Sequence, residues 1–503
     1  YDLPALHACA RAYTMCMITY NGNGGMDTVA VGLNERGSTL RQLPEGDVQL
    51  IRAYAGQHPE ILQHTSLHVF HCLSDGRART YFLIGLEGKP IRYSTYEDFR
   101  MARRLMAAAM KEGVSELAVM ADTLDMDLGS LIDGLLYRNY EFNHYKRQAK
   151  SRTIGNINIL THSLRPKEFN SMCYMYTSIY EGIYAARDLV NMPSNDLTPR
   201  KFADIVGAML KGDNILIENL NKWALEKRHM GGIVAVGKGS MNPPQLLSIA
   251  YQGDPNSREV LGIVGKGVTY DSGGLSLKSH ANLEFMKDDM AGAAAAVGVM
   301  RALMLLKYPV NVLAVLPLVE NIPSGMAYHV DDILTMYNGK TVEVKNTDAE
   351  GRLILADALT YAQEKGATRL IDLATLTGAC VTALGTVRTG MIGNDQEWMN
   401  RFFSAATEVH EKIWQLPADE EYEKFLESDV ADLKNVGGSE AGAITAGLFL
   451  KQFVHDGTPW IHLDIAGPAF NEKADETGLI GATGVGIKSI LHLLQGGVAS
   501  HDR

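Results

Sequence analysis

The sequence has few cysteines and no pair of them at the spacing of a metal or redox site. Five of its 503 residues are cysteine, and they stand far apart at Cys9, Cys16, Cys72, Cys173 and Cys380. An odd number without any CxxC pair predicts neither a disulfide framework nor a thiolate zinc site. We therefore expect reduced, buried thiols of the kind found inside cells.

Long apolar runs and an excess of positive charge are also missing. No run reaches the ~20 apolar residues of a membrane-spanning helix. The first residues, Tyr1 to Pro4, lack the basic and apolar regions of a secretory signal, so we expect a cytoplasmic protein. The formal net charge of −11 argues against nucleic acid as the main partner, because binding its backbone needs clustered lysine and arginine.

What is present is an ordinary globular composition, 46% hydrophobic and 21% charged. At ~150 residues per domain, the length predicts two to three domains. Residues 1–165 alternate strand-like and helix-like segments, and we expect a small N-terminal α/β domain with a structural or assembly role. The expected strands and helices there are Thr28–Leu33, His68–Cys72, Tyr81–Leu86, Glu116–Met120, Glu97–Lys111 and Leu128–Tyr137.

Three histidines in this part, His64, His68 and His71, raise the question of a zinc site. Their segment reads as a strand, and they keep no fixed helical pitch. We therefore interpret them as strand and surface residues rather than as metal ligands.

A connecting helix is predicted over residues 166–191, followed by a larger domain over 192–503. The helix should stop near Met192-Pro193, because the residue before proline leaves the helical region. Thr198 with Pro199 then fits the start of another helix. Strands alternate with helices beyond it, which predicts a central mixed sheet flanked by helices. The expected strands are 233–236, 260–264, 313–318, 370–374 and 461–465.

The most informative stretch runs from Asn346 to Arg352. A strand-like segment precedes it and a helical one, Leu353–Gln363, follows it, so its acids stand at a strand-to-helix junction. Open α/β sheets bind their ligands near such junctions. Asp348 and Glu350 repel each other there unless a cation lies between them or one is protonated. The stretch alone leaves two readings open, a metal site or a helix start that the helix dipole makes favourable for acids.

A second stretch, Gly265–Gly274, resembles a phosphate-binding loop but lacks both the dinucleotide glycine spacing and a Walker lysine. Ser272 is not in a nucleophile elbow either. The stretch does place Lys266 and Asp271 at a sheet end. Lys278 follows, and Asp289 stands at the start of a helix of small side chains.

Together the two stretches favour a pair of divalent ions. Four carboxylates, those of Asp271, Asp289, Asp348 and Glu350, balance the four positive charges of two such ions. Lys266 is a ligand only as a neutral amine, which needs the pKa depression that an adjacent dication provides. Lys278 and Arg352 remain as cations that stabilise negative charge developing on a substrate.

At this point the chain resembles the leucine (leucyl) aminopeptidase family, two-metal cytosolic exopeptidases, over about residues 187–495. Its signature octapeptide is matched in full by Asn346–Leu353. Matches to its other blocks follow in the same order, at Val264–Gly267, Asp271–Gly274, Asp289-Met290, Thr375–Ala379, Ala431–Asn435 and Trp460–Gly467. The turn at His329–Asp332 departs from the family, and we see no resemblance over the first 160 residues.

The resemblance implies one metal held by Lys266, Asp271, Asp289 and Glu350, and another by Asp271, Asp348 and Glu350. The metals would be zinc, or manganese or cobalt, and they would activate a water that attacks the first peptide bond. Lys278 and Arg352 match the catalytic pair, with a bicarbonate at Arg352 acting as general base. The pocket for the first side chain would include Met286, Thr375, Gly378 and Ala466, and would favour leucine and similar apolar residues. The family fold is a small variable N-terminal α/β domain with a larger catalytic α/β domain, assembled as a homohexamer.

Two rival hypotheses belong to other classes of protein. A non-catalytic scaffold or nucleic-acid-binding member of the same fold is disfavoured by the complete ligand set and the acidic charge. A nucleotide-dependent enzyme using Gly265–Gly274 or Gly481–Gly486 is disfavoured by the absent fingerprint spacing.

Overall fold

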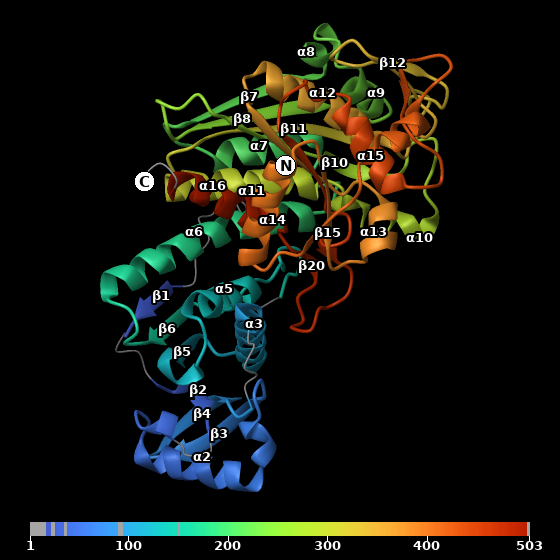
Figure 1. Ribbon diagram of the computed structural model, residues 1–503. Coiled ribbons are helices and arrows are strands. Elements are labelled where there is room, and N and C mark those ends of the chain that lie inside the picture. The colour runs from blue at the N-terminus through green and yellow to red at the C-terminus, as the bar shows by residue number, and fades with distance from the viewer. Residues whose placement is uncertain (1–16, 22–25, 35–37, 89–93, 149–150, 500–503) are drawn as a thin grey trace. The chain divides into compact units, whose positions relative to one another are not determined.

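The computed structural model describes residues 17–21, 26–34, 38–88, 94–148 and 151–499 (Figure 1). The chain forms two compact units. The larger unit includes Glu181–Lys473 and continues from Ile480, and the smaller unit includes the described residues up to Tyr180 together with Ala474–Leu479. Three cysteines, Cys72, Cys173 and Cys380, are free, while the other two lie outside the described residues. The predicted α/β class is confirmed.

The smaller unit is built on a six-stranded sheet with strand order β1-β6-β5-β2-β4-β3. Its strands are parallel except for β3, which is antiparallel to β4. The strands are β1 (Met17–Tyr20), β2 (Thr28–Leu33), β3 (Leu67–Ser74), β4 (Arg77–Gly85), β5 (Glu116–Met120) and β6 (Asn156–Leu160). Its helices include α2 (Glu45–Gln57), α3 (Thr95–Glu112), α4 (Ala121–Leu124) and α5 (Leu128–Arg138). The helices and strands predicted for this part of the chain are confirmed.

Helix α6 (Pro166–Asn191) confirms the long helix predicted after the first α/β segment. The border between the two compact units falls inside it, between Tyr180 and Glu181. Helix α7 (Pro199–Met209) begins as predicted, since the side chain of Thr198 accepts a hydrogen bond from the amide of Lys201. The domain boundaries at 165 and 191 stay predictions.

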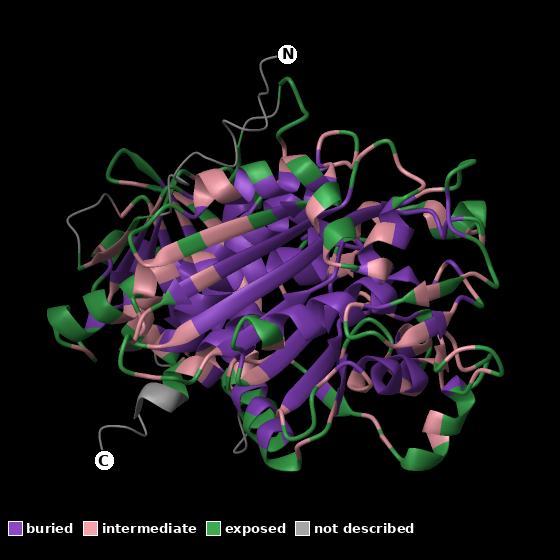
Figure 2. Cartoon of the chain, turned by 90° about the horizontal axis from the view of Figure 1, so that it is seen from above, coloured by how far each residue is buried: buried purple, intermediate pink, exposed green. Residues whose placement is uncertain are grey.

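The larger unit contains a nine-stranded mixed sheet with a parallel centre. The order is β16-β15-β18-β14-β9-β11-β8-β7, and β10 pairs with β11. Strands β18, β14, β9 and β11 are mutually parallel, and β8, β7 and β15 add antiparallel edges. Figure 2 shows the central strands fully buried, as expected for strands covered on both faces. Their bounds are β7 (Ile215–Asn221), β8 (Gln245–Gln252), β9 (Leu261–Gly265), β10 (Gly267–Asp271), β11 (Asn311–Asn321), β14 (Arg369–Ala374), β15 (Thr389–Gly393), β16 (Ile413–Gln415) and β18 (Trp460–Asp464).

Two groups of helices cover this sheet. Helix α11 packs with α16, and α16 with α14, while α12 packs with α9 and α15 (Figure 1). The helices are α8 (Lys222–Lys227), α9 (Gly231–Gly237), α10 (His280–Leu283), α11 (Ala291–Leu306), α12 (Glu350–Glu364), α13 (Gly378–Leu384), α14 (Gln396–Glu408), α15 (Gly442–Lys451) and α16 (Ile487–Ala499). Two small sheets complete the unit, one of β12 (Ile333–Thr335), β13 (Thr341–Glu343) and β17 (Leu433–Lys434), the other of β19 (Phe470–Asn471) and β20 (Gly481–Ala482). No helix in the described ranges is both long and apolar enough to cross a membrane.

The strand predicted over 233–236 is wrong, because these residues form helix α9. Four consecutive apolar residues fit a buried helix as well as a buried strand. The deciding contact is distant in sequence: Ile233 donates its amide hydrogen to Oδ2 of Asp357 at 3.0 Å. A carboxylate at this end satisfies an amide that a helix leaves free in its first turn.

Close packing of α11 on the sheet depends on Gly292. A Cβ at this position would lie 2.0 Å from the carbonyl oxygen of Leu373 and 3.0 Å from the backbone nitrogen of Lys266. We expect Gly292→Ala to lower the free energy of unfolding by about 1–3 kcal/mol, because the helix must move away from the strands. Urea unfolding measures the change.

Gly207→Ala is the matched control for that experiment. Gly207 is also a helical glycine, on α7, but a Cβ there would meet nothing within 4 Å. We expect this variant to unfold at the same or a higher urea concentration, since alanine in a helix is favoured over glycine by about 1 kcal/mol. Equal effects of the two substitutions would contradict the packing argument.

Candidate metal centre and substrate pocket

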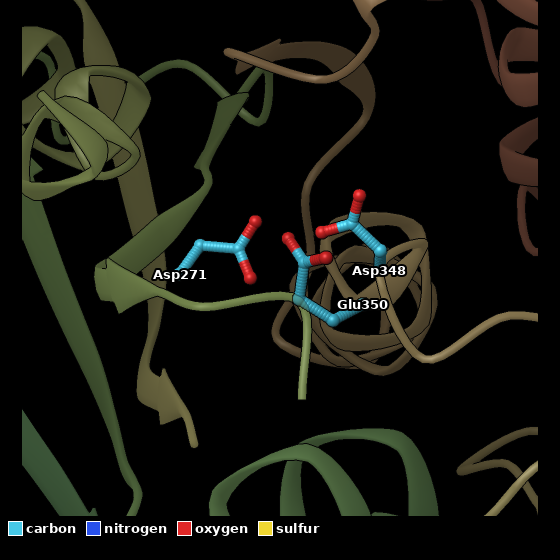
Figure 3. A group of neighbouring side chains, drawn as sticks. All are labelled: Asp271, Asp348 and Glu350. Atoms are coloured by element: carbon cyan, nitrogen blue, oxygen red, sulfur yellow. The ribbon is translucent and has the colours of Figure 1, made fainter. Parts of the chain in front are cut away.

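Three acidic side chains converge beside the carboxyl end of β10. Asp271 is the last residue of that strand, Asp348 lies in the turn before α12, and Glu350 is the first residue of α12. Each offers an oxygen within 4.8 Å of the others. Figure 3 shows the three carboxylates directed toward one another. The stretches Gly265–Gly274 and Asn346–Arg352, which the sequence predicted at one edge of the sheet, therefore lie next to each other.

The turn that carries Asp348 is held by Asn435. The Oδ1 atom of Asn435 accepts hydrogen bonds from the amides of Lys345 and Asn346, at 2.7 and 3.3 Å. Its Nδ2 group donates to the carbonyl of Asn346 at 2.7 Å. The amide of Asp348 in turn donates to Oδ1 of Asn346 at 2.8 Å. The side chains of Asn435 and Asn346 thus help to fix the segment between β13 and α12.

Lys266 and Asp289 extend this cluster on the side of β9 and α11. The Nζ atom of Lys266 lies 2.7 Å from Oδ1 of Asp289 and 2.9 Å from Oε1 of Glu350, and it donates to the carbonyl of Thr375 at 2.8 Å. Gly351 leaves the space for this lysine, because a Cβ there would lie 2.5 Å from its Cε. All five predicted metal ligands are therefore brought together.

The two predicted catalytic cations are placed differently. The Nζ atom of Lys278 lies 2.7 Å from Oδ2 of Asp271 and 2.5 Å from Oδ1 of Asp348, so it belongs to the cluster. Arg352 follows Glu350 on α12, and its Nη1 donates to the carbonyl of Asn435 at 2.8 Å. Its buried Nε has no hydrogen-bond partner among the described residues. Burial lowers the pKa of Arg352 to about 10, against the opposing charges of Glu350 and Asp464.

The protein's own charges leave this cluster negative. Burial raises the pKa of Asp289 well above its usual value, and it also raises those of Asp348 and Glu350, with the charge of Asp271 adding to both. Burial lowers the pKa of Lys266, but the charges of Asp289, Glu350 and Asp271 outweigh it and the net pKa is raised. Two ammonium groups thus face four carboxylates, and the neutral Lys266 amine predicted from the sequence requires a further cation.

The donor atoms fit divalent cations. Oδ2 of Asp289 is buried and finds no hydrogen-bond donor in the described part of the chain. Oδ1 of Asp348 and Oε1 of Glu350 are near ammonium groups but not in hydrogen-bonding geometry. Buried acceptors without donors are costly, and carboxylate oxygens are the ligands that hard cations prefer. A metal among these oxygens would remove the cost and lower the raised carboxyl pKa values.

Thr347 joins the two ligand-bearing stretches directly. Its Oγ1 donates to the carbonyl of Gly273 at 2.7 Å and accepts from the amide of Ser276 at 2.8 Å, while its own amide donates to Oγ of Ser276 at 3.1 Å. Gly273 and Gly274 have φ values of +85° and +64°, which favour glycine, so the loop can turn back toward Thr347. Thr347 lies inside the signature Asn346–Leu353, but this linking contact is not visible in the sequence.

The four predicted pocket residues lie near the carboxyl ends of β14 and β18 and before α11. Thr375 follows β14, and its Oγ1 donates to Oδ1 of Asp289 at 2.8 Å. Ala466 follows β18, which pairs with β14 so that Ala374 lies opposite Asp464. Gly378 begins α13 and is exposed, and Met286 begins the short helix η3 (Met286–Asp288) three residues before Asp289.

Asp464, which the sequence analysis did not single out, organises this edge. Its Oδ1 accepts from the amides of Leu376 and Ala466, both at 3.2 Å, and its Oδ2 accepts from Oγ1 of Thr377 at 2.6 Å. In the sequence, this role is indicated only by the position of Asp464 near the end of the strand predicted over 461–465.

Comparisons with known proteins show the family of this chain. Residues 184–491 match the profile described as "Cytosol aminopeptidase family, catalytic domain". A probable cytosol aminopeptidase of Alkaliphilus oremlandii is 39% identical over 93% of this chain and 96% of its own length, and one of Koribacter versatilis is 39% identical over 83% and 86%.

Two solved structures also resemble this chain over most of its length. A tomato leucine aminopeptidase mutant superimposes with a TM-score of 0.84 at 30% identity, covering 95% of this chain and 96% of its own. The bottromycin maturation enzyme BotP in complex with Mn superimposes with a TM-score of 0.81 at 29% identity, covering 94% and 100%. The likeness therefore extends to the smaller unit, over which the sequence showed no resemblance.

Proposed function

Because the chain belongs to the cytosol aminopeptidase family of metal-dependent hydrolases, we propose that it is a leucyl-type aminopeptidase. It would release single N-terminal residues from peptides, with leucine and similar apolar residues preferred. The observation that supports this most is the convergence of Asp271, Asp348 and Glu350 within 4.8 Å, with Lys266 in contact with Glu350.

Two divalent ions per subunit are the proposed cofactor. Lys266, Asp271, Asp289 and Glu350 would hold one, and Asp271, Asp348 and Glu350 the other, with two carboxylates shared. Bound there, such ions lower the pKa of water and polarise a carbonyl. Manganese is supported by the Mn complex of BotP, and zinc or cobalt suit the same nitrogen and oxygen donors.

Two cationic side chains of the chain, Lys278 and Arg352, would assist the hydrolysis. The ammonium group of Lys278, beside Asp271 and Asp348, is placed to stabilise negative charge on the oxygen of the attacked carbonyl. The free Nε of Arg352 is available to hold an anion, for which we propose bicarbonate as the carrier of the proton to the leaving amine. The free amino terminus of a peptide would bind at this metal centre as the neutral amine, so that only the first residue would be removed.

Specificity would arise beside Asp289. Met286, Thr375, Gly378 and Ala466 offer a thioether, a methyl group and little bulk, which suits a branched apolar side chain. Such a pocket separates substrates by only about 1–3 kcal/mol per methylene, so we expect graded preference rather than exclusion.

We also propose a homohexamer acting in the cytoplasm, as the family resemblance implies. Light scattering of the purified protein measures the assembly, and a stable monomer or dimer would contradict it.

Chelation gives the direct test of the proposed activity. We expect removal of divalent metal to abolish release of leucine from a leucyl peptide, and Mn²⁺ to restore it. The same peptide with an acetylated amino terminus is the control substrate and should resist cleavage, because it has no free amine. Activity that survives exhaustive chelation, or cleavage of the acetylated peptide, would refute the proposal.

A further inference from the structure

Asn321 is a buried side chain at the metal centre that neither the family signature nor the proposed mechanism uses. It is the last residue of β11, is only 1% exposed, and lies beside β10 at the register Asp271 to Asn321. Strand β11 thus ends where the ligand-bearing segments begin.

Both hydrogens of its amide group are engaged. Nδ2 donates to Oδ1 of Asp271 at 2.9 Å and to the carbonyl of Thr347 at 2.9 Å. The assignment of nitrogen and oxygen is fixed by the partners, because a flipped amide would set its oxygen against two acceptors. Oδ1 of Asn321, in contrast, has no donor in the described residues.

The first of these bonds selects which oxygen of Asp271 faces the cluster. Oδ1 of Asp271 accepts from Asn321 and also from the amide of Gly273, at 2.9 Å. Oδ2 is left toward the interior, where it lies 2.7 Å from Nζ of Lys278. The carboxylate is therefore oriented by donors behind it.

The second bond holds the residue before Asp348. The carbonyl of Thr347 accepts from Asn321 and also from the hydroxyl of Tyr328, at 2.8 Å. One amide group thus ties the strand that carries Asp271 to the turn that carries Asp348, at the point where the two stretches meet.

We propose that Asn321 is a positioning residue that sets the orientation of Asp271 and its distance from Asp348, so that their oxygens are arranged for a divalent metal before it binds. This inference rests on the proposed function. Partners behind metal-ligating carboxylates commonly change metal affinity by about 10–100-fold when removed.

The test is Mn²⁺ affinity, measured by calorimetry on the metal-free full-length protein. We expect Asn321→Leu, which keeps the branched shape and removes both donors, to raise the dissociation constant for Mn²⁺ by about 10–100-fold. Asn321→Ala, which cannot overpack, should have the same effect. Thermal unfolding of each metal-free variant shows whether it is folded.

Asn311 provides a matched control at the opposite end of the same strand. Its Nδ2 donates to the carbonyls of Asp254 and Ser257, at 2.8 and 3.1 Å, so it also ties two backbone segments together. We expect Asn311→Leu and Asn311→Ala to leave the affinity for Mn²⁺ unchanged.

Unchanged affinity in the Asn321 variants would overturn the inference. An equal loss in the Asn311 variants would overturn it too, because the effect would then be a general weakening of the sheet. Metal-free Asn321 variants that are unfolded would make this a folding residue and so reject the role. A wild-type protein that binds Mn²⁺ but releases no amino acid would refute the proposed activity and leave the role of Asn321 standing.

Discussion

Glu350→Gln should abolish hydrolysis, with kcat/KM for a leucyl peptide lowered by at least about a thousandfold, or roughly 4 kcal/mol of transition-state stabilisation. Glu350 is the carboxylate that contacts Lys266 at 2.9 Å and lies within 4.8 Å of both Asp271 and Asp348. An amide carries no charge, and its nitrogen cannot bind a cation, so it cannot serve two ions. Asp348→Asn should be nearly as damaging.

The loss should not come from unfolding. Burial raises the pKa of Glu350, with the charge of Asp271 adding to the effect, so ionising this side chain costs the metal-free fold free energy. A neutral glutamine should therefore leave the thermal stability of the metal-free protein equal or higher. Affinity for Mn²⁺ should fall together with activity.

Glu364→Gln is the control for this prediction. Glu364 ends the helix that Glu350 begins, and its side chain is 51% exposed. We expect normal hydrolysis and normal Mn²⁺ affinity from this variant. Normal hydrolysis by Glu350→Gln or Asp348→Asn would remove both residues from the proposed mechanism.

The parts of the site that the sequence predicted are those encoded locally. Glu350 begins helix α12 and Asp348 lies just before it, at a helix start that apolar periodicity located, and Asp271 follows the predicted strand 260–264 by a few residues. The parallel order of β9, β11 and β14 then brings the ends to one edge of the sheet. The signature Asn346–Leu353 indicated the family and, through it, the proposed metal-binding chemistry of these residues.

The parts it did not predict depend on partners distant in sequence. The start of helix α9 is satisfied by Asp357, more than a hundred residues away, and its own apolar run does not distinguish helix from strand. Strand β10 (Gly267–Asp271) was not among the expected strands, and it pairs in parallel with the distant strand β11. Nothing in the sequence distinguishes Asn321 from other asparagines. Its role is visible only in the fold, which places its amide group between Asp271 and Thr347.

The pKa of Lys266 also depends on side chains distant in sequence, and its direction in the metal-free protein was not predicted. The sequence suggested an amine with a lowered pKa, which assumed the charge of a metal. Among the protein's charges alone the net pKa is raised, because three carboxylates outweigh the effect of burial. As a proposed metal ligand, Lys266 should therefore release a proton when the metal binds, and the affinity for Mn²⁺, measured by calorimetry, should rise with pH.

Lys278→Met should lower kcat by about 10²–10³-fold, the usual effect of removing one group that stabilises a developing oxyanion. Burial lowers the pKa of Lys278, but the charges of Asp271, Glu350 and Asp348 raise it above its usual value. In the metal-free protein the neighbouring carboxylates thus favour the charged form, and the role we propose for it is electrostatic stabilisation of the oxyanion. Steady-state kinetics with a leucyl peptide measures the loss.

Metal affinity separates this variant from Glu350→Gln. Methionine keeps most of the side-chain volume but removes a positive charge 2.7 Å from Asp271 and 2.5 Å from Asp348. Because that charge competes with cations for the same oxygens, Mn²⁺ should bind Lys278→Met as tightly as wild type or more tightly, while turnover falls. Weakened Mn²⁺ binding would instead make Lys278 a support for the carboxylates.

Lys345→Met is the matched control, since Lys345 also pairs with two carboxylates, Asp331 and Glu343, at 2.7 and 3.0 Å. Its side chain is 40% exposed, and surface pairs of this kind contribute only about 0–1 kcal/mol. It should keep wild-type kcat and Mn²⁺ affinity. A similar loss in both variants would show that any lysine paired with two carboxylates near this turn has the same effect, and the role assigned to the buried ammonium group of Lys278 would fail.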